Sequence, residues 1–382
     1  MATKDHERVH RELLDIFGLD PDVLHLNHGA FGCAPIPVRR AAEAWRDRAE
    51  RNPNHFNGAE LPQLIASARH RAADFLGIDP ESTGLVRNVS EGVSSVLGSL
   101  GLRPGEEILL GSHGYGAVRI AAQNWAARSG AVVRIAEFDL AAEDDAIVAA
   151  YAEQAGPQTR LVVVDQITSP TAMVLPVSAI AAAVDAPVLA DSAHVPGTID
   201  SDIAGLGVGY WVGNLHKWCH TPRGTGVLWT REDLRDTTYP AVLSWQLPDG
   251  YAAAFDHPGT WDYSGWLALG DGLDFWASLG GWQQVARQAE LITSAQQRLA
   301  AALEASLDGL AQHPAPTMRL VPLPVDATTA RQLSGRLSEE YRIQVPVTAS
   351  GDNWYLRIAA GPYNTADDYD RLADAVVDLT RH

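Results

Sequence analysis

A lysine at position 217 has neighbours that suit covalent chemistry. It stands in the segment GNLHKWCHTPRGTGVLW, directly after the apolar run YWVGNL and among small, hydrogen-bonding residues. An amine at the end of a buried strand can lose its charge and form a Schiff base with a carbonyl compound. A lysine elsewhere is usually a solvated surface charge. Lys217 is therefore a candidate nucleophile if other residues complete a site around it.

An aspartate upstream offers a partner for a cationic group. In PVLADSAHVPG an apolar strand ends on Asp191, where the chain leaves the predicted core. A buried carboxylate requires a cation, and the protonated nitrogen of a pyridine ring would serve, with the pairing keeping the ring electron-withdrawing. The alternative interpretation is that Asp191 caps the helix that follows.

Two further strand ends carry polar or aromatic residues. In GLVRNVSEGVSSVLGSL a helix is predicted to begin near Ser90 and Glu91, and its free amide groups suit a phosphate dianion. A simple capping box is the alternative. In LLGSHGYGAVRIAAQ a glycine-flanked turn presents His113 and Tyr115, either of which could stack on a planar ring or pack on a neighbour.

The elements that must position these residues alternate regularly from about residue 85 to 230. Short apolar runs such as EEILLG and LVVVDQI are separated by Ala-rich helical stretches, which predicts a mostly parallel, doubly wound α/β sheet. Such sheets bind ligands at the carboxyl ends of their strands, where the candidate residues lie. We expect a large unit over 18–280 and a smaller α+β unit from 1–17 and 281–382. An amphipathic helix is predicted over 5–17.

The composition excludes several classes of protein. The 382 residues are 46% hydrophobic and carry 29 Lys and Arg against 47 Asp and Glu, a net charge of −18. This balance argues against nucleic-acid or anionic-membrane partners. No apolar run resembles a signal peptide or a membrane span, so a cytoplasmic location is expected. Two cysteines, Cys33 and Cys219, cannot build a disulfide framework.

The motifs together resemble the class V aminotransferase superfamily, which is fold type I of the pyridoxal-phosphate enzymes, in its isopenicillin N epimerase-like branch. The resemblance covers essentially the whole chain. It implies pyridoxal 5'-phosphate as cofactor, an amino acid as small-molecule substrate, and a homodimer with shared active sites. The motifs that carry it are LNHGAFGCAPIPV, NVSEG, HGYGAVRI, DSAHVPG, HKW, GTW and LRIAAGPYNTADDYDRL.

The resemblance also implies roles for individual residues. Lys217 would be the Schiff-base lysine, Asp191 would pair with the pyridine nitrogen, and His194 would bond the phenolic oxygen. Tyr115 falls at the ring-stacking position, which is a histidine in cysteine desulfurases, so His113 stays an alternative. Arg357 would grip the substrate carboxylate, although an interdomain salt bridge is the other interpretation. The expected phosphate ligands are Ser90 with its neighbours Val89 and Glu91, Asn214, His216, and Thr260 from the second subunit.

The reaction is less determined than the cofactor. Cysteine desulfurases use a cysteine in the C-terminal region, and this chain has none after Cys219. We expect a C–S β-lyase or a decarboxylating oxidative deaminase acting on a cysteine S-conjugate in antibiotic or other secondary metabolism, as in lincosamide-pathway enzymes. An epimerase or an aminotransferase is the alternative. A distant alternative is a zinc hydrolase using HERVH, with His6 and His10 as ligands and Glu7 as base; no other metal site is expected.

Overall fold

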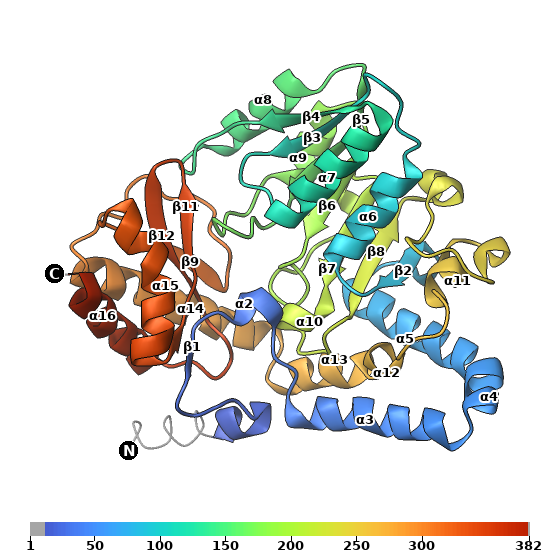
Figure 1. Cartoon of the computed structure of the whole chain (residues 1–382), viewed down its shortest axis with the longest axis horizontal. Helices are drawn as coiled ribbons and strands as arrows, with labels where there is room; N and C mark the ends of the chain where they lie inside the picture. Colours follow the sequence, from blue (N-terminus) through green and yellow to red (C-terminus); the bar gives the residue numbers. More distant parts are fainter. Residues whose placement is uncertain (1–11, 381–382) are drawn as a thin grey trace.

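A seven-stranded sheet forms the centre of the computed structural model, which describes residues 12–380 (Figure 1). The strand order is β2-β8-β7-β6-β5-β3-β4, and every pair from β7 to β4 is parallel, whereas β8 is antiparallel to both β2 and β7. The predicted mostly parallel α/β sheet is therefore confirmed. The strands are β2 Thr83–Val86, β3 Glu107–Gly111, β4 Val132–Ala136, β5 Thr159–Asp165, β6 Val188–Ser192, β7 Tyr210–Asn214 and β8 Gly226–Thr230.

Both faces of this sheet are covered by helices, which explains why its strands are continuously apolar. Along β3, Ile108 and Leu110 face one hydrophobic core while Leu109 faces the other. Helices α6 and α7 pack on the first face, and α5, α8, α9 and α13 pack on the second. These helices are α5 Leu61–Leu76, α6 Val89–Ser99, α7 Gly116–Ser129, α8 Asp144–Gln154, α9 Val177–Ala183 and α13 Leu269–Ser278.

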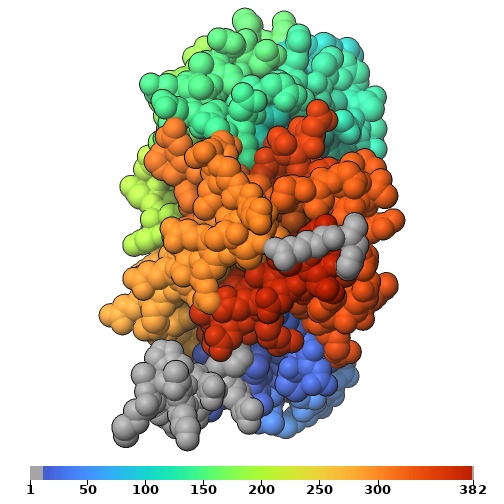
Figure 2. Space-filling view, turned by 90° about the vertical axis from the view of Figure 1, so that its left-hand side faces the viewer, coloured from blue at the N-terminus to red at the C-terminus, as the bar shows by residue number. Residues whose placement is uncertain are grey.

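The C-terminal residues build a second sheet with its own core. Strands β9 (Met318–Leu323), β11 (Val347–Ser350) and β12 (Asn353–Ala359) are antiparallel in the order β11-β12-β9. Their core includes residues of the helices α14, α15 and α16. Figure 2 shows this part in orange and red, between the green part of the large sheet unit and the blue N-terminal segment. The helices are α14 Trp282–Ala302, α15 Ala327–Tyr341 and α16 Ala366–Thr380.

The N-terminal segment connects the two sheets. Residues 12–17 are helical, and the part of the predicted helix before residue 12 lies outside the described residues. Strand β1 (Leu24–His25) then pairs in parallel with β10 (Ile343–Gln344) of the C-terminal part. The short helix α2 (His28–Phe31) follows and packs on α10 (Leu215–Trp218), which comes directly after β7 (Figure 1). The residue boundaries of the two units stay a prediction.

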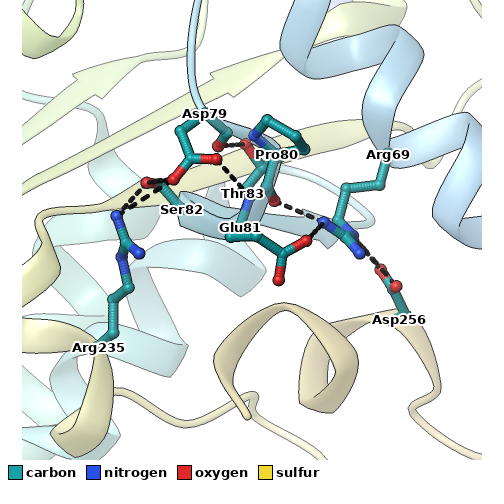
Figure 3. A network of polar contacts seen from close by, with 8 residues as sticks. All are labelled: Arg69, Asp79, Pro80, Glu81, Ser82, Thr83, Arg235 and Asp256. Atoms are coloured by element: carbon teal, nitrogen blue, oxygen red, sulfur yellow. Dashed lines mark hydrogen bonds and ion pairs between the residues drawn. The ribbon is translucent and has the colours of Figure 1, made fainter.

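A network of polar contacts fixes the helix α11 (Tyr251–Asp256) to the sheet unit (Figure 3). Arg69 of α5 is buried and donates hydrogen bonds to Asp256, to the carbonyl oxygen of Pro80 and to Glu81. These three acceptors come from α11 and from the turn before β2. The network therefore sets where the chain leaves α11 toward residues 257–263.

In residues 12–380 no helix is long and apolar enough to cross a membrane.

Candidate active site

The carboxyl ends of the strands bring the predicted site residues toward one edge of the sheet. Ser90 lies in the first turn of α6, which follows β2, and Tyr115 precedes α7, which follows β3. Asp191 lies in β6, in register with Asp165 of the neighbouring strand β5. Lys217 lies in α10, directly after β7. The arrangement follows from parallel strands, because their carboxyl ends share one edge.

Lys217 is buried, and its amine contacts a histidine. The chain has two lysines, Lys4 and Lys217, and the first lies outside the described residues. Lys217 Nζ lies 3.2 Å from His194 Nε2, and the indole nitrogen of Trp218 lies 3.4 Å from His194 Nδ1. An indole N–H only donates, so Nδ1 of a neutral His194 accepts and Nε2 carries the proton. A lysine amine that accepts a hydrogen bond from this N–H is in its uncharged form.

Electrostatics around Lys217 agree with an uncharged amine. Burial lowers the pKa of Lys217 to about 8, Asp191 opposes the shift, and the positive charge of Arg357 adds to it. Burial also holds the pKa of His194 well below its usual range. At pH 7 roughly a tenth of Lys217 is therefore a free amine, far more than for an ordinary lysine, and the free amine is the form that attacks a carbonyl carbon.

Asp191 has an oxygen that nothing in its surroundings satisfies. Its Oδ1 accepts a hydrogen bond from the Ala193 amide at 3.1 Å, whereas its Oδ2 is buried and has no hydrogen-bond partner in the described part of the chain. Burial raises the pKa of Asp191 to about 6. A buried, unpartnered carboxylate oxygen is costly unless a ligand supplies a donor. The N–H of a protonated pyridine ring fits this unpaired acceptor.

The N-terminus of α6 offers polar groups for a phosphate. Asn88 caps the helix by accepting from the Glu91 amide at 3.0 Å, and Asn214 accepts from the Val89 amide at 3.0 Å. Ser90, which lies between Val89 and Glu91 in the sequence, is exposed. The Glu91 carboxylate accepts hydrogen bonds from the side chain and the backbone amide of Arg87. The helix N-terminus is thus partly capped and partly free.

His216 lies in α10, two residues after Asn214, whose side chain contacts this N-terminus. Its Nδ1 donates to the carbonyl oxygen of Thr225 at 3.0 Å, because a carbonyl can only accept. Burial lowers the pKa of His216 to about 4, so Nε2 carries no proton. A phosphate dianion near Nε2 would raise this pKa and turn the nitrogen into a donor.

The structure separates the two candidates for ring stacking. The His113 ring is buried, lies 5.0 Å from the Phe138 ring, and its Nε2 lies 2.9 Å from the Phe138 carbonyl oxygen. Tyr115 is 45% exposed, and its backbone amide donates to Asp165 Oδ1 at 3.2 Å. The role of Tyr115 as the ring-stacking residue stays a prediction. The His113 ring is instead held by its contacts with Phe138.

Arg357 comes from β12, in the other sheet, and is held from two sides. It donates to the backbone and side-chain oxygens of Ser169 and, at 3.1 Å, to Asn27 Oδ1. Its Nε is buried without a partner among the described residues, and burial lowers its pKa to about 10. The interdomain salt bridge considered above is not formed within residues 12–380, because these acceptors are neutral oxygens. A carboxylate ligand would satisfy the charge.

Thr260 does not come from the strand ends that carry most of the other predicted site residues. It is exposed in the turn between α11 and α12 (Ser264–Leu267), and the Tyr263 hydroxyl closes this turn on the carbonyl oxygen of Gly259. Helices α11 and α12 pack on α5, and α12 also packs on α3 (Ile36–Arg51). The turn is thus preformed, with Thr260 open to an outside contact.

Several residues of the site were not found by sequence reasoning. Asn27 and Ser169 brace Arg357, Asp165 fixes the Tyr115 backbone, and His28 contacts the Lys217 carbonyl oxygen at 2.8 Å. The motif containing Asn27 and His28 was noted in the sequence without a role. Two adjacent polar residues before a glycine, Asn27 and His28, were the sequence signal for a role in the site.

The cysteines and the histidine-rich N-terminus bear on other chemistries. Cys219 is buried, and burial raises its pKa well above the usual value; burial also raises the pKa of the half-buried Cys33. Neither thiol has the environment of a reactive thiolate. The HERVH segment lies outside the described residues, and within 12–380 no cluster of three metal-ligating side chains occurs.

Comparisons with known proteins agree with this geometry. The chain is 33% identical to isopenicillin N epimerase of Amycolatopsis lactamdurans, with 95% of this chain and 96% of that protein covered. It is 31% identical to the enzyme of the same name from Streptomyces clavuligerus over the full length of both. A probable chloroplastic L-cysteine desulfhydrase of Arabidopsis thaliana is 27% identical, with 95% and 84% covered.

Solved structures show the same fold. The cystine C–S lyase C-DES, bound to its product cysteine persulfide, superposes with a TM-score of 0.81 at 24% identity, covering 95% of this chain and 99% of that one. A sequence profile of the family described as aminotransferase class-V matches residues 42–372. The chain therefore belongs to the class-V aminotransferase family of pyridoxal-phosphate-dependent enzymes.

Proposed function

We propose that this enzyme cleaves the C–S bond of a cysteine S-conjugate or a similar amino acid by β-elimination. The observation that carries the proposal is that the Lys217 amine, which contacts His194, lies at the same edge of the sheet as the unsatisfied Asp191 Oδ2. Pyridoxal phosphate, when bound, withdraws electrons from the substrate α-carbon. The protein then has to hold the ring, orient the substrate and move one proton.

The residues divide these tasks among them. Lys217 would hold the cofactor through its amine and afterwards take the proton from the α-carbon. Asp191 would keep the pyridine nitrogen protonated, His194 would face the phenolic oxygen, and Tyr115 would cover the ring. Arg357 would bind the substrate carboxylate in two places and so turn the α-carbon bond toward the lysine.

The phosphate would bind at the amide groups of the α6 N-terminus with help from Ser90, Asn214 and His216. Thr260 would act from a second subunit, because it is exposed in a preformed turn. Exposed apolar side chains in the segment before α11 support such a dimer, since Leu243 is 62% exposed and Trp245 is 89% exposed. We therefore also propose a homodimer with shared sites.

The environments of the two cysteines support release of the sulfur as a thiol. In β-elimination the Cα–H and Cβ–S bonds break, a Cα=Cβ bond forms, and the thiol leaves with a proton; water then converts the remainder to pyruvate and ammonia. No protein thiolate is needed, and both Cys33 and Cys219 have raised pKa values. A desulfurase would instead need a reactive thiolate to receive the sulfur.

Epimerisation at the α-carbon is the second candidate function. It is supported by the 31 to 33% identity to isopenicillin N epimerases over nearly the full length. It would require a second proton donor on the face of the α-carbon opposite Lys217. We assign that role to the phenol of Tyr115, the residue expected to cover the ring.

Product analysis tests the proposal directly. The purified enzyme is incubated with L-cysteine, L-cystine and S-alkyl-cysteines, and products are identified by mass spectrometry and chiral chromatography. Thiol with pyruvate is the expected result. Inverted substrate would favour the epimerase, and carbon dioxide or a keto acid that still carries the sulfur substituent would contradict β-elimination.

A variant at residue 217 tests the lysine itself. Lys217→Ala should lose the visible absorbance of the Schiff base and all turnover, because the chain offers only Lys4 as another lysine. After borohydride reduction of the wild type, peptide mapping should find the cofactor on Lys217. Cofactor trapped on Lys4, or turnover by the variant, would contradict the assignment.

A further inference from the structure

His28 and Tyr363 form a buried chain of hydrogen bonds that ends on the backbone of Lys217. His28 Nε2 lies 2.8 Å from the Lys217 carbonyl oxygen, and His28 Nδ1 lies 3.0 Å from the Tyr363 hydroxyl oxygen. The three residues come from α2, from α10 and from the turn between β12 and α16. His28 is 4% exposed and Tyr363 is 3% exposed. Water therefore does not compete for these bonds.

The direction of each bond follows from the chemistry of the groups. The Lys217 carbonyl can only accept, so His28 Nε2 carries the ring proton. Burial lowers the pKa of His28 to about 4, so the ring is neutral and Nδ1 is an acceptor. Burial also raises the pKa of the Tyr363 phenol, which keeps its proton and donates it to Nδ1. Tyr363 thus selects the tautomer that binds Lys217.

Close packing leaves α2 little freedom against α10. The His28 ring lies 5.0 Å from the Trp218 ring, and a Cβ atom at Gly29 would lie only 2.9 Å from that ring. Asn27, the residue before His28, accepts the hydrogen bond from Arg357. One short segment therefore touches both the backbone of Lys217 and the side chain of Arg357.

We propose that His28 is a positioning residue for Lys217, held in its working tautomer by Tyr363. The inference rests on the proposed role of Lys217. By fixing the carbonyl of residue 217, His28 fixes the backbone from which the lysine side chain extends toward His194. Tyr363 extends the constraint to the C-terminal unit, so the lysine and Arg357 keep their separation when substrate binds.

Schiff-base formation measures the position of the lysine without a known substrate. Apoenzyme is mixed with pyridoxal 5'-phosphate, and the rise of the Schiff-base absorbance is followed. His28→Phe keeps a planar ring against Trp218 but loses the donor, and we expect roughly a ten- to hundredfold slower rise. Tyr363→Phe should slow it less, because the ring proton of His28 can then sit on either nitrogen. His28→Gln should recover part of the rate through its amide donor.

Tyr369→Phe is the matched control. Tyr369 is also buried in the C-terminal unit and donates to a backbone carbonyl, that of Ala359. This variant should lose some thermal stability and keep the wild-type rate. An equal slowing in Tyr369→Phe would mean general loosening and would overturn the inference.

The remaining outcomes separate this inference from the proposed function. If Lys217→Ala abolishes the absorbance while His28→Phe forms it at the wild-type rate, the lysine assignment stands and the role of His28 falls. If Lys217→Ala still forms the band, the proposed function falls first. Should His28→Phe fail to fold, wild-type rates in both His28→Gln and Tyr363→Phe would equally overturn the inference.

Discussion

At the scale of single residues, burial makes the charged forms of two site residues costly. Lys217 has a lowered pKa, and Asp191 has a raised one beside a second buried carboxylate, Asp165. Both shifts have burial as their largest cause. Each group is therefore held in a costly state that a bound cofactor would relieve: the lysine by becoming an imine, and Asp191 by gaining a cationic partner.

The carboxylate pair predicts how the cofactor-free protein responds to pH. Because the pKa of folded Asp191 is about 6, above its unfolded value, the folded state binds the extra proton. The stability this proton gives is complete below about pH 4 and is lost as pH rises through 6. At pH 7 the apo form of Asp191→Asn should thus be more stable than wild type, by on the order of 2 to 3 kcal/mol.

Urea unfolding of both apoproteins at pH 4 and pH 7 measures this difference. With pyridoxal phosphate present, the order should reverse, because the neutral amide of the variant cannot balance a pyridinium charge. Equal stabilities of the two apoproteins at pH 7 would show that ionised Asp191 does not destabilise the folded state. A variant that retained the cofactor as tightly as wild type would argue against the pyridine pairing.

At the scale of elements, short helices directly after strands present the reactive groups. Helix α10 carries Lys217, and α2 packs on it and brings Asn27 to Arg357. Helix α11 leads to the turn with Thr260 and is tied to α5 by Arg69 (Figure 3). The position of each helix depends on such ties, because helices this short have little stability of their own.

The hydrogen bonds of Arg69 predict that alanine substitutions at two arginines of α5 lower the free energy of unfolding by very different amounts. Arg69→Ala would leave Asp256 and the Pro80 carbonyl oxygen buried without a partner, and it should lower the free energy of unfolding by about 3 kcal/mol. Arg71→Ala is the control, since Arg71 and its partner Asp274 are exposed, and it should cost less than about 1 kcal/mol. Urea titration of both variants checks this; equal losses would contradict the structural role of the network.

At the scale of the whole molecule, the described part of the chain exposes side chains that are suited to contact a second copy of the protein. Thr260 is exposed on a fixed turn, and Leu243 and Trp245 are large apolar side chains open to solvent. Phosphate binding by Thr260 in a partner's site would make each active site incomplete without dimerisation.

Mixing two defective variants tests shared sites. Lys217→Ala and Thr260→Ala subunits, unfolded and refolded together, should form mixed dimers in which one site has both lesions and the other has none. The mixture should thus recover wild-type cofactor affinity in one site per mixed dimer. If Thr260 served its own chain, neither site would be intact, and the mixture would behave as the sum of its parts.

The sequence by itself determined the strand-helix alternation and with it the parallel sheet. It also placed Lys217, Asp191 and Tyr115 at strand ends, since apolar runs mark strands and parallel strands end at one edge. These features depend on local patterns. The tertiary structure alone decided that His113 turns toward Phe138, that Asn27 and Ser169 brace Arg357, and that burial shifts the pKa values. His28 and Tyr363 are 335 positions apart, and no local pattern encodes such a contact, because it forms only when both sheets are packed.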